Sequence, residues 1–429
     1  MVTPTWERRP GVAPRLVHVN VTARGGEVAG LLHGLVPAQA AAGGSTGWAV
    51  LGTDPVFLAF TRYLHHLLHG RADALTTQRL AVAVPHYRSV LEPQAAWLAA
   101  RLAPGDAVVL HGPQTLGMAP VLAGAGLRTV WHCHSGTTDE EASGPAAVWD
   151  AFRSELSTVD AVVSTLPEFA PRALPAARRH VVAPAVDQDS PRNQVLSGAE
   201  VTALLADLGL TTKPTKHSGK VLQDRPLPAD APMVLQLSRW APLKDMAGVL
   251  RSVPELSADT HVVLAGHDPA EPPGDPEGQA VLDEVIELRS GLAPADRSRV
   301  HLVSLSTQDE RAANALQRRA DVVLQKSLAE GFGLTVTEAM LKRRAVVAAD
   351  VGGLRQQISP GHNGMLVNPR DPGEVADALR GLLDDPLLRR RLGTHAAASV
   401  HRRYLMPRLV ADYQLLADPD PLNRASDAA

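Results

Sequence analysis

Short apolar runs alternate along the chain with loops and longer amphipathic segments. Buried-strand runs occur at residues 15–21, 106–110, 128–133, 233–237 and 300–305. A loop and a helical pattern follow most of these runs, and apolar positions in the helical segments recur at the spacing of one helix face. This alternation predicts an α/β fold, with mainly parallel sheets covered by helices on both faces.

The hydrophobic pattern is interrupted once for about twenty residues. Residues 211–231 are rich in Pro, Lys, Thr and Asp and lack apolar periodicity, which is typical of an interdomain linker. A chain of 429 residues also favours two mid-sized domains. The predicted organisation is an N-terminal domain at 1–212, a linker at 213–231, a C-terminal domain at 232–400, a return helix at 401–418 packing on the N-terminal domain, and a disordered tail at 419–429.

Charge and composition argue against several classes of protein: nucleic-acid-binding, disulfide-stabilised and membrane-spanning. The formal net charge of -3 gives no reason to expect nucleic acid or an anionic membrane. The single cysteine, Cys133, rules out an intrachain disulfide framework. No segment has 18 uninterrupted apolar residues, so we expect no membrane span and a cytoplasmic protein.

The segment 321–358 carries the strongest pattern. An apolar run enters a turn bracketed by Gly331 and Gly333 and continues into a helix-forming sequence. Free backbone N–H groups at such a helix start can hold an anion, and the glycines let the backbone approach it. Glu330 and Glu338, with seven residues between them, flank the turn and could face one ligand.

Two further loops suit phosphate groups. Arg239 and Lys244 follow the strand at 233–237, where two cations could neutralise a diphosphate. Surface ion pairs are the alternative for either cation. Gly25 and Gly26 follow the first strand, where the local geometry suits anions, with an ordinary tight turn as the alternative.

The segment around Glu330 resembles a known family. Its Gln-Lys-Ser-Leu-Ala-Glu-Gly-Phe-Gly-Leu-Thr-Val-Thr-Glu-Ala-Met sequence is similar to retaining nucleotide-sugar glycosyltransferases with two facing Rossmann-like domains, the GT-B architecture. Within this group it most resembles trehalose synthases. The resemblance covers about residues 17–416 and implies a donor site formed by Gly25, Gly26, Arg239, Lys244, Glu330, Gly331, Phe332, Gly333, Leu334 and Glu338.

His132 and His134 alternate along the strand at 128–133 and so share a face. A metal site, a structural histidine and a sugar contact compete as interpretations. The resemblance favours the sugar contact, because trehalose synthases have Trp-x-Cys-His-x-Asp here and His134 matches their histidine. Gly136 stands where the family has Asp, and Ser135 replaces an apolar residue, so the acceptor is expected to differ in its contacts.

The resemblance implies a retaining transferase that moves a hexosyl group from a nucleotide-sugar to a sugar acceptor, forming a trehalose-like 1,1 bond. Expected catalytic residues are His134, Arg239, Lys244 and Glu330; acceptor contacts are His134, Ser135 and Gln114. No cofactor and no metal are expected, and a homodimer is an allowed assembly. The alternatives are a natural-product glycosyltransferase acting on an aminosugar, cyclitol or nucleoside sugar, a nucleotide-sugar epimerase, and a non-catalytic binding protein.

Overall fold

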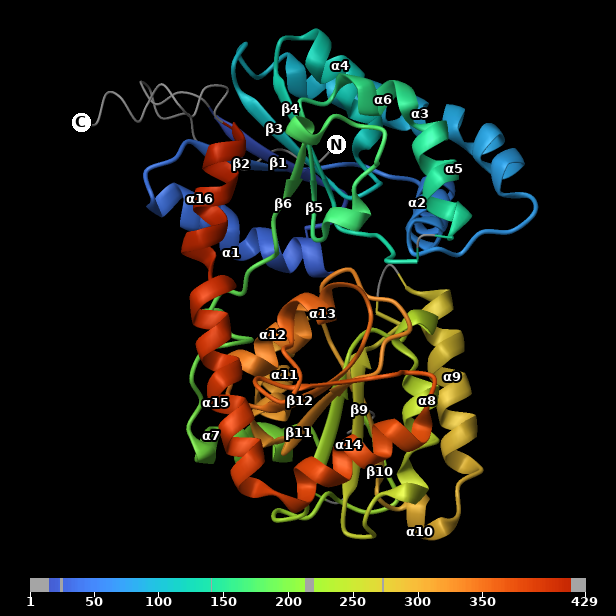
Figure 1. Ribbon diagram of the computed structural model, residues 1–429, viewed down its shortest axis with the longest axis vertical. Coiled ribbons are helices and arrows are strands. Elements are labelled where there is room, and N and C mark those ends of the chain that lie inside the picture. The colour runs from blue at the N-terminus through green and yellow to red at the C-terminus, as the bar shows by residue number, and fades with distance from the viewer. Residues whose placement is uncertain (1–14, 24–25, 140, 213–219, 272–273, 418–429) are drawn as a thin grey trace. The chain divides into compact units, whose positions relative to one another are not determined.

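A computed structural model describes residues 15–23, 26–139, 141–212, 220–271 and 274–417. The chain divides into two compact units. The N-terminal unit comprises Met1–Ala185 and Met406–Ala429, and the C-terminal unit comprises Val186–Leu405. Each unit is an α/β domain with one predominantly parallel sheet, as the hydrophobic pattern predicts (Figure 1).

The sheet of the N-terminal unit has the order β2-β1-β3-β4-β5-β6, and all of its pairings are parallel. Side chains alternate between its faces: Val17 and Val19 pack in one apolar cluster, and Leu16 packs in another. Helices cover both faces (Figure 1). The strands are β1 (Leu16–Asn20), β2 (Thr46–Val50), β3 (Ala107–His111), β4 (Arg128–Cys133), β5 (Ala161–Ser164) and β6 (Arg179–Val181). The helices are α1 (Glu27–Ala41), α2 (Pro55–Leu68), α3 (Thr76–Ala99), α4 (Ala119–Gly124), α5 (Ser143–Ala151), α6 (Arg153–Thr158) and α16 (Met406–Ala417).

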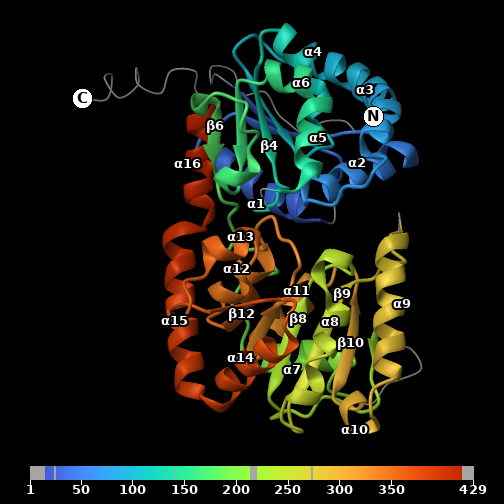
Figure 2. The same cartoon turned by 45° about the vertical axis from the view of Figure 1, so that its right-hand side comes forward.

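The sheet of the C-terminal unit has the order β13-β12-β11-β8-β9-β10-β7, with only β7 antiparallel among its described pairings. Helices α8 and α9 pack against each other beside this sheet (Figure 2). The strands are β7 (Val221–Leu222), β8 (Met233–Leu237), β9 (His261–His267), β10 (Val300–Leu305), β11 (Val322–Gln325), β12 (Ala345–Ala349) and β13 (Met365–Val367). The helices are α7 (Gly198–Asp207), α8 (Met246–Leu250), α9 (Pro276–Ser290), α10 (Pro294–Arg297), α11 (Glu310–Arg319), α12 (Leu334–Leu341), α13 (Gly352–Gln357), α14 (Pro372–Asp384) and α15 (Pro386–Arg403).

Each sheet reverses its direction of growth once. In the N-terminal unit the chain runs from β1 to β2 and then returns to place β3 on the other side of β1. In the C-terminal unit it runs from β8 through β9 and β10 and returns to place β11 on the other side of β8. The carboxyl ends of strands at such switch points are where open α/β sheets bind ligands. The expected sites are therefore the loops after β1 and β3 and the loops after β8 and β11.

The boundary between the units differs from the predicted linker. Residues 186–212 belong to the C-terminal unit, because α7 packs on α11 and the Asn314 side chain donates to the Pro191 and Gln194 carbonyl groups. Within the predicted linker, β7 pairs with β10, whereas residues 213–219 lie outside the described part of the chain. The polar segment predicted as a linker therefore lies within the C-terminal unit. The chain crosses between the units at 185–186 and 405–406.

The predicted return helix corresponds to α16, which is part of the N-terminal unit. It packs beside α1 and β4, and Arg128 donates from Nε to the Leu416 carbonyl oxygen at 2.7 Å. The predicted tail at 419–429 lies outside the described residues. Among the helices described, none combines the length and the apolar character that crossing a membrane requires.

Candidate active site

A buried glutamine joins the two loops at the switch point of the C-terminal unit. Gln236 lies on β8 and is fully buried. Its Nε2 donates to the Lys244 carbonyl oxygen at 2.7 Å, and its Oε1 accepts from the Lys326 backbone N–H at 2.9 Å. The backbone N–H of Leu328 also donates to the Leu243 carbonyl oxygen at 2.8 Å. These bonds hold the loop after β8 against the loop after β11.

The two loops bring Lys244 and Glu330 together. The Lys244 Nζ lies 2.6 Å from Glu330 Oε2, and both side chains are buried. Ser327 donates its hydroxyl to the same carboxylate oxygen at 3.0 Å. A second ion pair joins Lys326 to Asp245, which has the left-handed φ of 46°. The sequence placed Lys244 and Glu330 in one site, and the structure brings these two side chains into contact.

The glycine-bracketed turn continues directly into α12. Gly333 caps this helix with a left-handed φ of 85°, and as a glycine it offers no side chain to bond the N–H groups of the first turn. Gly353 approaches the turn so closely that a Cβ there would collide with the Gly331 carbonyl oxygen. Phe332 is buried against Tyr404 with ring centroids 5.4 Å apart, and Leu334 is partly exposed. The contacts of Gly353 and Tyr404 thus fix the turn, while its N-cap residue provides no side-chain cap for the helix.

Glu338 forms an ion pair separate from that of Glu330. Arg192 Nε lies 2.8 Å and 2.9 Å from the two carboxylate oxygens of Glu338. Arg239, the other predicted donor cation, lies just after β8 and is exposed. Next to the Arg192–Glu338 pair, the Lys342 Nζ donates to Asn193, to Gln317 and to the Glu338 carbonyl oxygen. Burial lowers the pKa of Lys342 to about 7.

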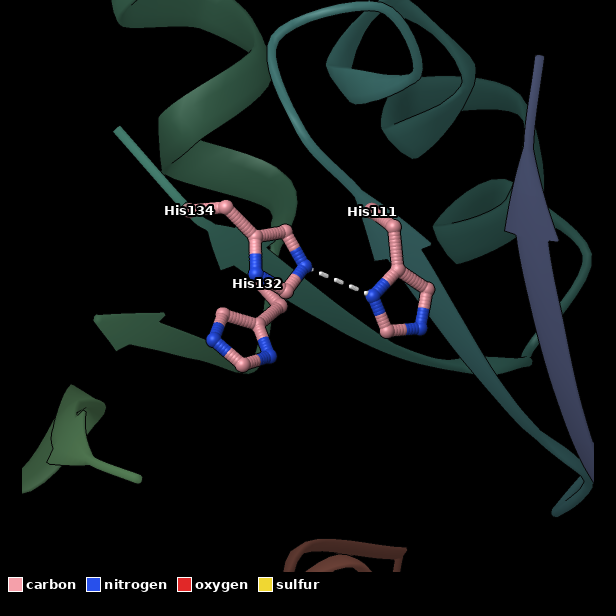
Figure 3. Close-up of side chains that lie close together, drawn as sticks. All are labelled: His111, His132 and His134. Carbon is pink, nitrogen blue, oxygen red and sulfur yellow. Dashed lines mark hydrogen bonds between the residues drawn. The ribbon is translucent and has the colours of Figure 1, made fainter. Parts of the chain in front are cut away.

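Histidines gather beside the switch point of the N-terminal unit, at the ends of β3 and β4. His111 ends β3, and His132 and His134 lie at the end of β4, with rings stacked at 3.8 Å between centroids (Figure 3). His134 is partly exposed, and its Nε2 lies 2.9 Å from His111 Nδ1. Burial lowers the pKa of His134 to about 3 and that of His111 well below 6.5. These rings are therefore neutral at pH 7.

The same three histidines are the group of described residues that could ligate a metal, since their nitrogen atoms lie within 4.8 Å of one another. His132 Nδ1 is hydrogen-bonded to the Tyr413 hydroxyl of α16, and His132 Nε2 has no partner among the described residues. The cluster therefore has nitrogen atoms that could act as metal ligands, but His132 Nδ1 is already hydrogen-bonded to the Tyr413 hydroxyl.

The other predicted residues of the N-terminal unit occupy different surroundings. Ser135 is buried, and its hydroxyl lies 2.9 Å from His65 Nδ1. The Gln114 side chain is partly exposed and folds over Gly112, which has the left-handed φ of 74°. Gly26 begins α1 with a φ of 78°. Gly25 lies outside the described residues.

The departure at Gly136 has a packing reason. A Cβ at this position would overlap the ring of Phe169, which is buried after β5. The space that a carboxylate side chain at 136 would need is therefore filled by an aromatic ring.

Sequence reasoning missed several residues of these sites: Gln236, Arg192, His111, Tyr413 and His18, whose Nδ1 lies 2.9 Å from His111 Nε2. Gln236 and His18 carried a local signal, because each is a polar residue inside an apolar strand, Met-Val-Leu-Gln-Leu for Gln236 and Leu-Val-His-Val-Asn for His18. The others become neighbours through strand order or through the return of α16, which no local pattern encodes.

Comparison with known proteins places the chain in a family. The profile of trehalose synthase N-terminal domains matches residues 18–171, and that of glycosyl transferases group 1 matches residues 220–399. A trehalose synthase of Rubrobacter xylanophilus is 32% identical over 412 residues, which cover 93% of this chain and 88% of that protein. The chain belongs to the trehalose synthase family.

One further relative and one solved structure have other names. A D-inositol 3-phosphate glycosyltransferase of Xylanimonas cellulosilytica is 29% identical over 341 residues, covering 79% of this chain and 67% of that protein. An E. coli trehalose-6-phosphate protein bound with UDP-2-fluoro glucose superposes with a TM-score of 0.72 at 15% identity, covering 94% of this chain and 99% of that chain. The fold is that of GT-B glycosyltransferases, and the protein is a glycosyltransferase acting on sugars.

Proposed function

We propose that this protein transfers a hexosyl group from a nucleotide-sugar to a sugar acceptor with retention, forming a trehalose-like 1,1 bond. The observation that carries the proposal is the Lys244–Glu330 pair at the switch point of the C-terminal unit, with Nζ and Oε2 2.6 Å apart. Gln236 joins the two loops that carry these residues. Membership of the trehalose synthase family supports the same reaction.

The donor site in this proposal is built from charge and backbone geometry. Arg239 and Lys244 supply positive charge for a diphosphate, and the start of α12 supplies backbone N–H groups and the positive end of the helix dipole. Glu338 accepts hydrogen bonds from the ribose, and Arg192 keeps its carboxylate oriented. The E. coli structural neighbour carries UDP-2-fluoro glucose, which supports a nucleotide-sugar for this fold.

The transfer step follows from that arrangement. The acceptor hydroxyl attacks the anomeric carbon on the face from which the diphosphate leaves, so the configuration is retained. The bond from that carbon to the phosphate oxygen breaks, the bond to the acceptor oxygen forms, and the hydroxyl proton passes to a departing diphosphate oxygen. Arg239, Lys244 and the α12 N-terminus stabilise the charge that develops there, and we expect no metal to be required. Glu330 contacts the donor sugar, and His134 orients the reacting sugar.

The acceptor side favours a second candidate. Phe169 fills the space beside Gly136, so a carboxylate is not available there to bind sugar hydroxyl groups. A cyclitol, aminosugar or nucleoside sugar is therefore the alternative acceptor to glucose, and the similarity to an inositol-phosphate glycosyltransferase supports it.

A thermal-shift panel of nucleoside diphosphates and nucleotide-sugars tests the donor. A ligand at about 100 times its dissociation constant should stabilise the protein by about 2.7 kcal/mol. Arg239→Ala removes an exposed cation, so it should preserve the fold and weaken that stabilisation. Arg251→Ala, another exposed arginine of the C-terminal unit, is the matched control and should leave it unchanged. Failure of every nucleotide to stabilise the wild-type protein would contradict the proposal.

An acceptor screen with the best donor then separates the candidate functions. A glucosyl disaccharide from free glucose supports the trehalose-like reaction. Transfer only to a cyclitol, aminosugar or nucleoside sugar supports the second candidate. Isomerisation of the donor with no acceptor present would instead identify an epimerase.

A further inference from the structure

A short segment after the first crossing between the units carries Arg192 to Glu338. Residues 187–194 form turns, with neither helix nor strand, so no helix or sheet ladder holds them in place. The Arg192 Nε nevertheless lies 2.8 Å and 2.9 Å from the two Glu338 carboxylate oxygens. Hydrogen bonds outside regular secondary structure must therefore determine where Arg192 lies.

Asn193 is the centre of these bonds. Its side chain is buried, with Nδ2 donating to the Asp187 carbonyl oxygen at 2.9 Å and Oδ1 accepting from Lys342 Nζ at 2.7 Å. A backbone carbonyl oxygen only accepts a hydrogen bond, so Nδ2 must be the atom facing Asp187 and Oδ1 the atom facing Lys342. Asn193 thus closes the turn within the segment and ties it to the end of α12.

Lys342 connects Asn193 to two helices. It follows α12, one helical turn after Glu338, and its Nζ donates to Gln317 Oε1 of α11 at 2.7 Å and to the Glu338 carbonyl oxygen at 3.3 Å. Gln317 Nε2 donates in turn to the Thr335 carbonyl oxygen at 2.9 Å. An amine and an ammonium group both have enough N–H groups for the bonds to Asn193 and Gln317, so these bonds do not require a charged Lys342.

The backbone of the segment is bonded to α11. Asn314 Nδ2 donates to the Pro191 and Gln194 carbonyl oxygens at 3.0 Å and 2.8 Å. The Arg318 guanidinium donates to the Asn193 and Gln194 carbonyl oxygens at 3.0 Å and 2.9 Å. The backbone is therefore held immediately before and after the arginine of the ion pair.

We infer that Asn193 and Lys342, acting through Arg192, orient the carboxylate that binds the donor ribose. The inference rests on the proposed function, which assigns the ribose to Glu338. A carboxylate has lone pairs on both oxygens, and a single N–H shared between them leaves each oxygen able to accept from one of two neighbouring hydroxyl groups. Asn193 and Lys342 are positioning residues, because they reach the ribose only through the ion pair.

A brace that only stabilises the fold is the competing explanation. It would make the same hydrogen bonds, and its loss would lower the free energy of unfolding without changing how the protein distinguishes one nucleotide from another. Both explanations predict reduced stability when the bonds are removed. They differ in what they predict for selectivity towards the ribose hydroxyl groups.

Calorimetry of the full chain with a ribonucleoside diphosphate and its 2′,3′-dideoxy counterpart measures that selectivity. The base is the one that gives the largest thermal shift. Hydroxyl groups bonded to a charged carboxylate strengthen binding, so we expect the wild type to prefer the ribonucleotide by about tenfold or more. The dideoxy compound keeps the base and the diphosphate, so its affinity reports on the rest of the donor site.

Asn193→Ala removes the amide that ties the segment to α12. We expect its preference for the ribonucleotide to fall to about threefold or less, with the affinity for the dideoxy compound within about twofold of the wild-type value. The KM for the nucleotide-sugar should rise with little change in kcat, because the ribose contact is equally strong in the ground state and the transition state. Arg192→Met, at a partly exposed side chain, should have the same effect and serves as the test if Asn193→Ala does not fold.

Gln223→Ala is the matched control. Gln223 is another buried amide of the C-terminal unit, which donates to the Gly209 carbonyl oxygen at 2.9 Å and lies 2.7 Å through Oε1 from His301 Nδ1. Its loss should cost stability and retain the full preference for the ribonucleotide. A full preference in Asn193→Ala, an equal loss of affinity for both nucleotides, or a lost preference in Gln223→Ala would overturn the inference in favour of a brace.

The two proposals fail in different ways. A wild type that binds no nucleotide contradicts the proposed donor and the inference together. A wild type that binds both nucleotides equally well leaves the diphosphate assignment in place and overturns only the role of Asn193 and Lys342.

Discussion

Lys244 and Glu330 form a charge pair buried at the end of two adjacent strands, 2.6 Å apart. Both residues were predictable, because each follows an apolar strand in a loop with phosphate-site or family character. Their contact was not, because it depends on β11 lying next to β8, a feature of sheet order that no local pattern contains. Gln236 stands out locally as a polar residue inside an apolar strand, but its role in joining the two loops depends on the same sheet order.

Breaking this pair should affect stability and turnover together. Lys244→Ala leaves Glu330 buried without its cation, which costs about 3–5 kcal/mol in the free energy of unfolding. The double variant Lys244→Met with Glu330→Gln removes both charges and should recover most of that stability in urea unfolding. Turnover with a nucleotide-sugar should be abolished in both variants. Near-normal turnover in either one would rule out Lys244 as a stabiliser of the leaving group.

The lowered pKa of Lys342 predicts that the free energy of unfolding changes with pH above neutrality. Burial lowers its pKa from 10.5 to about 7, so between these values the unfolded chain binds the proton and the folded chain does not. The free energy of unfolding should therefore rise with pH in this window, by at most about 1.4 kcal/mol per pH unit.

Urea unfolding at several pH values between 7 and 10 checks this assignment. Lys342→Met should lose the rise. Lys220→Met, at an exposed ion pair with Asp309, is the control and should retain it. Equal slopes in the wild type and Lys342→Met would show that burial does not shift this group.

At the scale of elements, most strands were predictable and α3 was not. Runs such as Met233–Leu237 and Val300–Leu305 form strands with the predicted bounds, because fully buried parallel strands have continuous apolar sequences. α3 contains Pro85 and Pro93, which remove backbone donors and usually end a helix. Both prolines are exposed, and buried residues such as Tyr87 and Leu91 hold the helix on its inner face. Tertiary packing overrode the local signal.

The close approach of α13 to the Glu330 loop gives a prediction for a glycine. Gly353→Ala would drive its methyl group against the Gly331 carbonyl and should displace the turn, at a cost of about 1–3 kcal/mol. Stabilisation by the nucleotide in the thermal-shift assay should be lost. Gly381→Ala in α14 has open space around the new Cβ and should stabilise the protein by about 0.5–1 kcal/mol. Equal nucleotide binding by both variants would refute the idea that α13 shapes the donor loop.

At the scale of the whole molecule, the two-unit organisation followed from length and alternation, but its boundary did not. The polar stretch around 213–231 lies within the C-terminal unit, and the crossings at 185–186 and 405–406 carry no break in composition. Each candidate cluster lies at or beside its own unit's switch point, which only strand order reveals. The resemblance of the Glu330 segment identified the family correctly, while His111 and His18 entered the N-terminal cluster through the order of β1, β3 and β4.

The return of α16 to the N-terminal unit can be tested through one hydroxyl. Tyr413→Phe removes the partner of His132 Nδ1 and leaves a buried ring without its hydrogen bond. We expect a loss of about 1–3 kcal/mol in the free energy of unfolding. Tyr63→Phe, which removes a less buried bond to Thr76, is the matched control and should cost less. Equal losses would argue against tight docking of α16.

The reaction itself provides the most direct test of the account. The protein is incubated with the nucleotide-glucose that stabilises it best and with glucose labelled with ¹³C at C1, and the product is analysed by NMR. The account predicts a disaccharide whose labelled carbon lies in the glycosidic bond, coupled to the donor anomeric proton, with the donor carbon in its original configuration. A product with the label at a free reducing end, an inverted donor carbon, or hydrolysis of the donor without transfer would contradict it.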